Sequence, residues 1–120
     1  MHLNHQPFEA IKNGTKKIEI RLNDSKRSQL KIGDPIHFTD LKTGEILDTE
    51  VKGLEHFKTF KELFQKYSGS IIGSPDTKNV EELDQENTEI YSRDSEQSYG
   101  ALAIKLKLKI STNVDQPTVK

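Results

Sequence analysis

A short stretch near the N-terminus, residues 14–21, holds three residues of types that commonly bind ligands: Lys16, Glu19 and Arg21. Arginine presents a planar fork of donors that suits a phosphate or a base edge, and lysine presents a compact cation. A carboxylate between them can accept from the amino group of a base or orient both cations. These types favour binding of a polar, partly anionic ligand, with Lys17 as a further cation beside them.

The same residues lie in a segment that alternates between charged and apolar side chains. Residues 17–22 read Lys-Ile-Glu-Ile-Arg-Leu, which predicts a strand whose isoleucines and leucine enter the core while Lys17, Glu19 and Arg21 share the opposite face. Taken alone, that pattern favours an exposed ladder of charges, in which each pair contributes less than about 1 kcal/mol. A binding role therefore needs support from the rest of the chain.

Further candidates for ligand contact lie near the C-terminus. Tyr99 can stack a base, a contact worth roughly 1–3 kcal/mol in single-strand binders, or it can be an ordinary tyrosine at the entrance of a strand. Lys105, Lys107 and Lys109 lie on one face of that predicted strand and could follow a phosphate backbone. Lysines in such positions more often keep a strand in water and discourage edge pairing, and we favour that interpretation.

The sequence indicates neither a metal site nor a nucleophilic triad. It contains no cysteine, and its four histidines are spread too widely to define a metal site by spacing. The carboxylate pair Glu81-Glu82 lies at a predicted helix N-terminus, where the helix dipole explains it. We therefore expect no metal and no cofactor.

Length and charge narrow the class of protein. With 120 residues and 32% apolar side chains, the chain has room for one hydrophobic core. The net charge of −1 argues against bulk binding of duplex nucleic acid, which usually requires a strongly basic domain. The acidity concentrates in residues 68–95, with 2 basic against 7 acidic side chains. Because no apolar run reaches the roughly 20 residues that cross a bilayer and no signal peptide is recognisable, we expect a cytoplasmic protein without membrane contact.

Hydrophobic periodicity predicts interleaved helices and strands. Three helices are expected, at residues 7–14, 59–67 and 79–91. Strands are expected at residues 17–22, 35–39, 46–56 and 102–110. The second and third helices begin at capping-box signatures, Thr59 with Glu62 and Asn79 with Glu82, and Gly53 predicts a bulge. Because the strands mostly alternate, we predict an α+β fold with an antiparallel or mixed β-barrel, whose last strand is half-buried.

Four segments in order resemble the ASCH family of small PUA-like domains. Residues 14–21 have the form G-x-K-x-x-E-x-R, and residues 8–14 resemble the helix before that motif. Residues 31–34 resemble the family's G-D turn, and residues 98–104 resemble its closing Y-G-x-L-x-I strand. The resemblance implies a domain over residues 1–110 that forms a small PUA-like mixed or antiparallel β-barrel with flanking helices, of which the pattern predicts about three. After that domain the pattern predicts a flexible tail at 111–120.

The resemblance also implies a cleft beside the motif, which the family is supposed to use for RNA. The partner expected from it is RNA or a modified nucleoside or nucleotide. Its ligand-binding residues would be Lys16, Lys17, Glu19, Arg21 and Tyr99.

Two other functions stay open. Some bacterial members with a similar motif are amidohydrolases that remove the acyl group from N4-acetylcytidine, and they carry a threonine where this chain has Glu19. An enzyme of this kind would have to use Lys16 and Glu19 as its catalytic residues, with Glu19 as general base in place of a covalent threonine. The remaining alternative is a protein-interaction module that uses the acidic segment 76–94.

Overall fold

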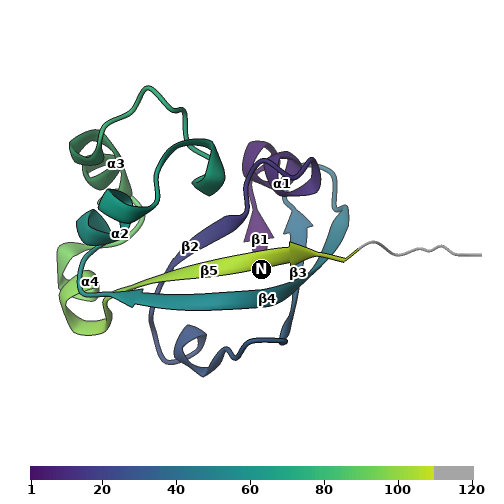
Figure 1. The fold of residues 1–120 in the computed structure, drawn as a ribbon, viewed down its shortest axis with the longest axis horizontal. Coiled ribbons are helices and arrows are strands. Elements are labelled where there is room, and N and C mark those ends of the chain that lie inside the picture. Colours follow the sequence, from purple (N-terminus) through teal and green to yellow (C-terminus); the bar gives the residue numbers. More distant parts are fainter. Residues whose placement is uncertain (110–120) are drawn as a thin grey trace, which may run out of the picture.

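The computed structural model describes residues 1–109 and has an α+β architecture built on one five-stranded sheet (Figure 1). Its strands are β1 (His2–Leu3), β2 (Ile18–Leu22), β3 (Pro35–Asp40), β4 (Ile46–Phe57) and β5 (Ala101–Leu108). Its helices are α1 (His5–Lys12), α2 (Phe60–Lys66), α3 (Val80–Asn87) and α4 (Arg93–Tyr99), with the short 3-10 helices η1 (Arg27–Gln29) and η2 (Gly69–Ile72). The predicted strand end at Ile110 and the predicted tail at 111–120 lie outside the described residues.

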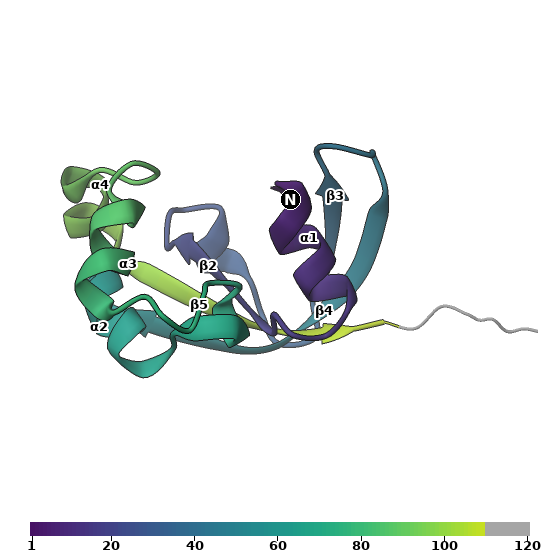
Figure 2. The ribbon, with the colours of Figure 1, turned by 90° about the horizontal axis from the view of Figure 1, so that it is seen from above.

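The sheet is mixed and curves into a half-barrel (Figure 2). The strand order is β1-β3-β4-β5-β2, in which β1 runs parallel to β3 and every other neighbouring pair is antiparallel. β1 and β2 are the two edges, and no strand pairing joins them within residues 1–109. The predicted PUA-like mixed sheet is confirmed, and its open side lies between the two edge strands.

The helices gather at two ends of the sheet, as Figures 1 and 2 both show. α1 lies beside β1 and β3, while α2, α3 and α4 lie together at the opposite end. About three flanking helices were predicted and four are present in the described part of the chain. Over the same residues, no helix combines the length and the apolar character needed to cross a membrane.

Short-range signals account for where the helices begin. Thr59 and Asn79 each accept a hydrogen bond from the backbone amide three residues further on. The predicted capping box is complete at Asn79 with Glu82, whereas at Thr59 only the side-chain cap forms. The predicted extent of the third helix, 79–91, is wrong because α3 ends at Asn87 and a separate helix α4 follows. The Ser92 side chain caps α4. Periodicity missed α4 because that helix has few apolar residues.

β5 lies in the middle of the hydrophobic core. Its leucines and isoleucine up to Leu106 pack with α1, and its two alanines pack with α2 on the other face. The predicted half-buried strand is therefore wrong for residues 101–104, which are all buried, because helices cover both faces there. The alternation returns further along, where Lys105 and Lys107 are exposed as predicted.

Gly53 forms the predicted irregularity in β4. The register between β4 and β5 shifts between Val51 and Gly53. A Cβ atom at Gly53 would lie 3.1 Å from Cδ of Lys105, so the absence of a side chain lets Lys105 lie across β4.

Candidate ligand-binding site

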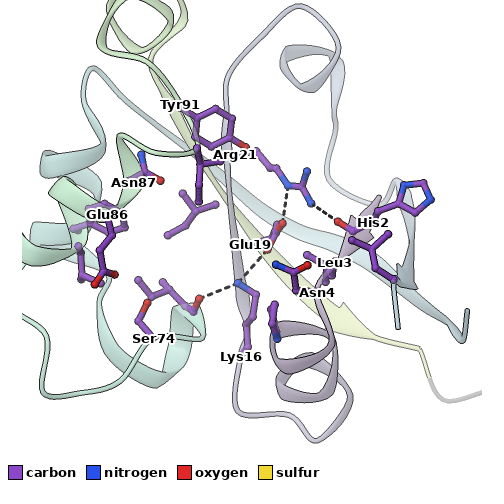
Figure 3. Close-up of a pocket in the computed structure, with 17 residues that line it drawn as sticks. His2, Leu3, Asn4, Lys16, Glu19, Arg21, Ser74, Glu86, Asn87 and Tyr91 are labelled. Carbon is purple, nitrogen blue, oxygen red and sulfur yellow. Dashed lines mark hydrogen bonds and ion pairs between the residues drawn. The ribbon is translucent and has the colours of Figure 1, made fainter. Parts of the chain in front are cut away.

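A pocket of about 400 Å³ lies at the open side of the half-barrel. We call it the edge pocket. β2 forms its floor, β1 and the start of α1 form one wall, and η2, α3 and the segment after α3 form the opposite wall (Figure 3). Its volume lies within the range typical of small-molecule sites.

Glu19 is the centre of a buried ion network on the floor of the edge pocket. Its Oε1 lies 3.1 Å from Lys16 Nζ, and its Oε2 lies 2.6 Å from Arg21 Nε (Figure 3). Lys16 and Glu19 are only 6% and 4% exposed, so each charge depends on its partner for compensation. The exposed charge ladder favoured by the strand pattern alone is therefore wrong for Glu19. The three residues singled out by their spacing do meet in one pocket.

The ammonium of Lys16 already uses its donors within the protein. Besides the Glu19 contact, it donates to the carbonyls of Ile18 at 3.1 Å and Ile72 at 2.9 Å, and an ammonium has three protons to donate. The bond to Ile72 ties η2 to the beginning of β2. Lys16 thus positions a wall of the pocket, and a ligand could contact its ammonium only by replacing one of these bonds.

Arg21 reaches across the opening between the two edge strands. Its Nη2 donates to the carbonyl of His2 in β1 at 3.3 Å while its Nε donates to Glu19. Its Nη1 has no hydrogen-bond partner within residues 1–109. Burial, and then the nearby Arg21 guanidinium, lower the pKa of the Met1 amino group, as expected beside a positive charge. Arg21 can therefore offer both charge and a free donor to a ligand.

Asn87 on α3 is a pocket residue that the sequence analysis did not single out. It is 8% exposed and lines the edge pocket, on the wall opposite His2 and Asn4 (Figure 3). Its side-chain amide has no hydrogen-bond partner in the described part of the chain. A ligand that fills the pocket would displace water from this amide and must offer hydrogen bonds in exchange. The available signal was its position four residues after Leu83, on the buried face of the helix.

Apolar side chains flank the polar floor. Leu41 and Ile90 are 61% and 72% exposed, and both line the edge pocket. Tyr91, next to Ile90, is held by stacking on Phe60, with ring centroids 5.3 Å apart and ring planes 6° apart. A polar floor between apolar walls suits a flat ligand with polar edges.

Comparison with protein families agrees with this architecture. The family model described as ASCH domain matches residues 1–110. The chain belongs to the ASCH domain family. The match spans the motif on β2, the open side of the half-barrel and the closing strand β5, so the edge pocket is built entirely from ASCH domain residues.

Two solved structures resemble this ASCH domain closely. The crystal structure of hypothetical protein PH0355 is 37% identical with a TM-score of 0.79, over 91% of this chain and 96% of that chain. The solution structure of protein PF0455 from Pyrococcus furiosus is 33% identical with a TM-score of 0.68, over 90% of this chain and 97% of that chain. A comparison with curated proteins finds no match.

The other two predicted ligand residues of the ASCH domain lie outside the edge pocket. Lys17 is exposed and lines a separate pocket with Lys105 and Lys107. Tyr99 is the last residue of α4, two residues before β5 begins; it is 51% exposed and lines a third pocket, which His56 also lines. Contacts from these two residues would therefore involve parts of a ligand that extend beyond the edge pocket.

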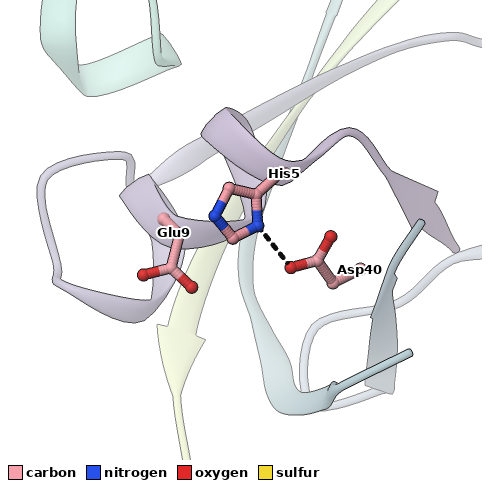
Figure 4. Close-up of side chains that lie close together, drawn as sticks. All are labelled: His5, Glu9 and Asp40. Atoms are coloured by element: carbon pink, nitrogen blue, oxygen red, sulfur yellow. Dashed lines mark hydrogen bonds and ion pairs between the residues drawn. The ribbon is translucent and has the colours of Figure 1, made fainter. Parts of the chain in front are cut away.

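A second cluster of titratable side chains joins α1 to the end of β3 (Figure 4). One potential ligand atom from each of His5, Glu9 and Asp40 lies within 4.8 Å of the others. His5 Nδ1 is 2.7 Å from Asp40 Oδ2, and Asp40 Oδ1 accepts from the Lys42 amide at 2.9 Å. Burial acts to raise the pKa of Asp40, but the hydrogen bonds from His5 and Lys42 outweigh burial and hold that pKa below its ordinary value. These bonds explain the cluster as a link between two elements.

Proposed function

We propose that this ASCH domain binds RNA or a nucleotide by holding one nucleobase in the edge pocket. The observation that carries the proposal is the side-chain amide of the largely buried residue Asn87, which has no hydrogen-bond partner within residues 1–109 and lines the same pocket as the Arg21 guanidinium. The ASCH family is commonly linked to RNA binding, which agrees with a ligand of this class.

The amide of Asn87 suits a base edge that presents a donor beside an acceptor. An asparagine side chain offers one acceptor oxygen and an NH₂ donor, and asparagine pairs in this way with the N6 and N7 atoms of adenine. The exposed apolar side chains Leu41 and Ile90 line the same pocket. They can cover the flat faces of a base while Asn87 reads its edge.

The charge of the edge pocket suits a base with at most one phosphate. Glu19 compensates Lys16 and accepts from Arg21, and Glu86 at the rim is paired with Lys78 at 2.6 Å. Arg21 keeps a free donor and is the natural contact for a phosphate or a ribose hydroxyl. The edge pocket has too few available cations to compensate the charge of several linked phosphates.

A thermal-shift screen of nucleosides, nucleoside monophosphates and short RNAs tests the proposal, because a ligand selective for the folded state raises the melting temperature. Asn87→Ala should weaken binding of the best ligand by about tenfold, the loss expected when one asparagine–base pair is removed. Gln85→Ala, an exposed change on the same helix, is the matched control. The proposal fails if no member of the screen stabilises the protein, or if Asn87→Ala and Gln85→Ala bind equally well.

The contacts around Lys16 and Glu19 favour binding over the amidohydrolase alternative. A general base must reach the proton of a water molecule, but both oxygens of Glu19 already accept bonds from cations. Incubation with N4-acetylcytidine, with Lys16→Ala as the comparison, tests the alternative directly. Cytidine formed by the wild-type protein above the level of the variant would support hydrolysis.

The acidic segment 76–94 has a place in this proposal as a wall of the pocket. Part of its charge is paired within the fold: Arg93 bonds Asp84 at 2.8 Å and Glu96 at 2.9 Å. Leu83 is buried in the core, and Asn87 lines the edge pocket. These contacts favour a ligand-binding role over a detachable surface for protein partners.

A further inference from the structure

Beside the edge pocket lies a second pocket of about 510 Å³, which we call the lysine pocket. Its cations are Lys17, Lys52, Lys105 and Lys107. Its apolar residues come from β2, β5 and η2, and Tyr67 lies among them. The lysine pocket shares no lining residue with the edge pocket.

The two pockets are separated by a wall one residue thick. Lys16 and Ile72 line the edge pocket, and the adjacent residues Lys17 and Ile71 line the lysine pocket. The wall is held by backbone bonds: the Lys17 amide donates to the Ile71 carbonyl at 2.9 Å, and the Leu106 amide donates to the Lys17 carbonyl at 2.9 Å. Consecutive Cα atoms are about 3.8 Å apart, so the linings of the two pockets adjoin at this wall.

The cations of the lysine pocket lack carboxylate partners. Within residues 1–109, none of the four lysines has a carboxylate oxygen within 4.0 Å, the limit for an ion pair. The acid nearest to Tyr67, Glu55, is already engaged: it accepts from Lys66 at 2.6 Å and from the Tyr67 hydroxyl at 2.7 Å. Hydrogen bonds from Lys66 and then Tyr67 hold the pKa of Glu55 below its ordinary value. Glu50 lies opposite Lys107 in the sheet. Lysines therefore dominate the charge of this surface.

Lys105 is held toward this surface by its neighbours. Its aliphatic chain crosses β4 where Gly53 has no side chain, and its Nζ lies 5.7 Å from the centre of the Tyr67 ring. Contact between a cation and an aromatic ring restricts where the ammonium can go. Lys105 is therefore more restricted than a freely solvated surface lysine.

We propose that the lysine pocket carries the phosphodiester backbone of a single-stranded RNA whose base occupies the edge pocket. This inference rests on the proposed function and extends it, because it makes the ligand a strand and not a free nucleoside. The edge pocket is nearly charge-compensated and suits a base, whereas the lysine pocket offers unpaired cations one residue away. Neighbouring nucleotides that cross the wall would place their phosphates beside Lys17, Lys105 and Lys107.

The test compares two probes on two variants. The probes are a labelled single-stranded RNA of about ten nucleotides, within the range that compact single-strand binders cover, and the matching nucleoside monophosphate. The first variant is Lys17→Ala/Lys105→Ala/Lys107→Ala. The control variant, Lys26→Ala/Lys31→Ala/Lys42→Ala, removes the same charge from exposed lysines that line neither pocket. Affinity is measured over a range of salt concentrations.

The first variant should bind the RNA more weakly, and the slope of log K against log salt should shrink by about 2, at about 0.7 for each lost phosphate contact. Its affinity for the monophosphate should match that of the wild type. If both variants bind RNA equally while the monophosphate still binds the wild type, the lysine pocket inference is overturned and the proposed function survives. If neither probe binds the wild type, the proposed function itself fails. Capture of an acidic peptide in place of RNA by the lysine pocket would also overturn the inference.

Discussion

The carboxylate of Glu19 lies 3.1 Å from the ammonium of Lys16, and both side chains are buried beneath the edge pocket. Glu19 belongs to β2, whereas Lys16 precedes the strand and is free of its alternation. That difference lets two residues on a short segment turn toward each other. The pair forms the floor on which Arg21 is oriented.

Glu19→Gln should destabilise the fold strongly. The variant leaves the buried Lys16 ammonium without its anionic partner, and breaking a buried ion pair from one side costs about 3 kcal/mol. Urea unfolding followed by circular dichroism measures the free energy of unfolding. The exposed change Glu89→Gln should stay within about 0.5 kcal/mol of the wild type. Similar losses in both variants would contradict a buried network.

Gly100→Ala should cost more stability than Gly44→Ala, although both glycines have positive φ angles of 76° and 78°. A Cβ at Gly100 would lie 2.7 Å from the carbonyl oxygen of Phe57, whereas a Cβ at Gly44 would meet nothing within 4 Å. Strain alone accounts for about 1 kcal/mol at Gly44, and the backbone clash should bring Gly100→Ala to about 3 kcal/mol or more. The urea midpoints of the two variants, measured side by side, check this prediction. Equal midpoints would contradict the close approach of the Gly100 backbone to the carbonyl oxygen of Phe57.

Asp40 should make the free energy of unfolding depend on pH in the acidic range. Its folded pKa lies below the ordinary value of 3.8, so its stabilisation is complete above the unfolded pKa and is lost as pH falls through the folded one. Asp40→Asn should lower the urea midpoint at neutral pH. Below about pH 4 the midpoint should fall less steeply with pH in this variant than in the wild type. Asp48→Asn is the matched control, because Asp48 pairs with His37 at 2.6 Å but is 53% exposed. A control variant that changes the pH profile as much as Asp40→Asn would refute this role.

The His5 cluster should not depend on a metal ion for its structural role. The 2.7 Å contact between His5 and Asp40 already links α1 to the end of β3. EDTA or zinc chloride should therefore leave the melting temperature unchanged, while His5→Ala should lose about 1 kcal/mol of stability with the hydrogen bond. A zinc-dependent rise in the wild type that is absent from His5→Ala would show that the cluster is a metal site.

Signals that act over a few residues were readable from the sequence. Capping at Thr59 and Asn79 and the bulge at Gly53 each depend on neighbouring residues, and the structure has them. β2 forms a strand where one was predicted, but Glu19 is buried beside Ile18, so the predicted alternation of its side chains is wrong there. α4 was missed because its signal, the Ser92 cap, was not matched by an apolar periodicity. The two buried faces of β5 were missed because alternation cannot tell whether a second layer of helices covers the outer face.

The sequence by itself indicated the family, a sheet-based α+β fold and the grouping of Lys16, Glu19 and Arg21, because these follow from residue types at short spacing. Only the tertiary structure decided that Asn87, distant in the chain, faces that set, and that Lys17 lies on the other side of the wall from Lys16. The physical reason is that a pocket forms where separate elements pack together. The set of residues that line a pocket therefore depends on long-range packing, which a pattern of neighbouring residues does not reveal.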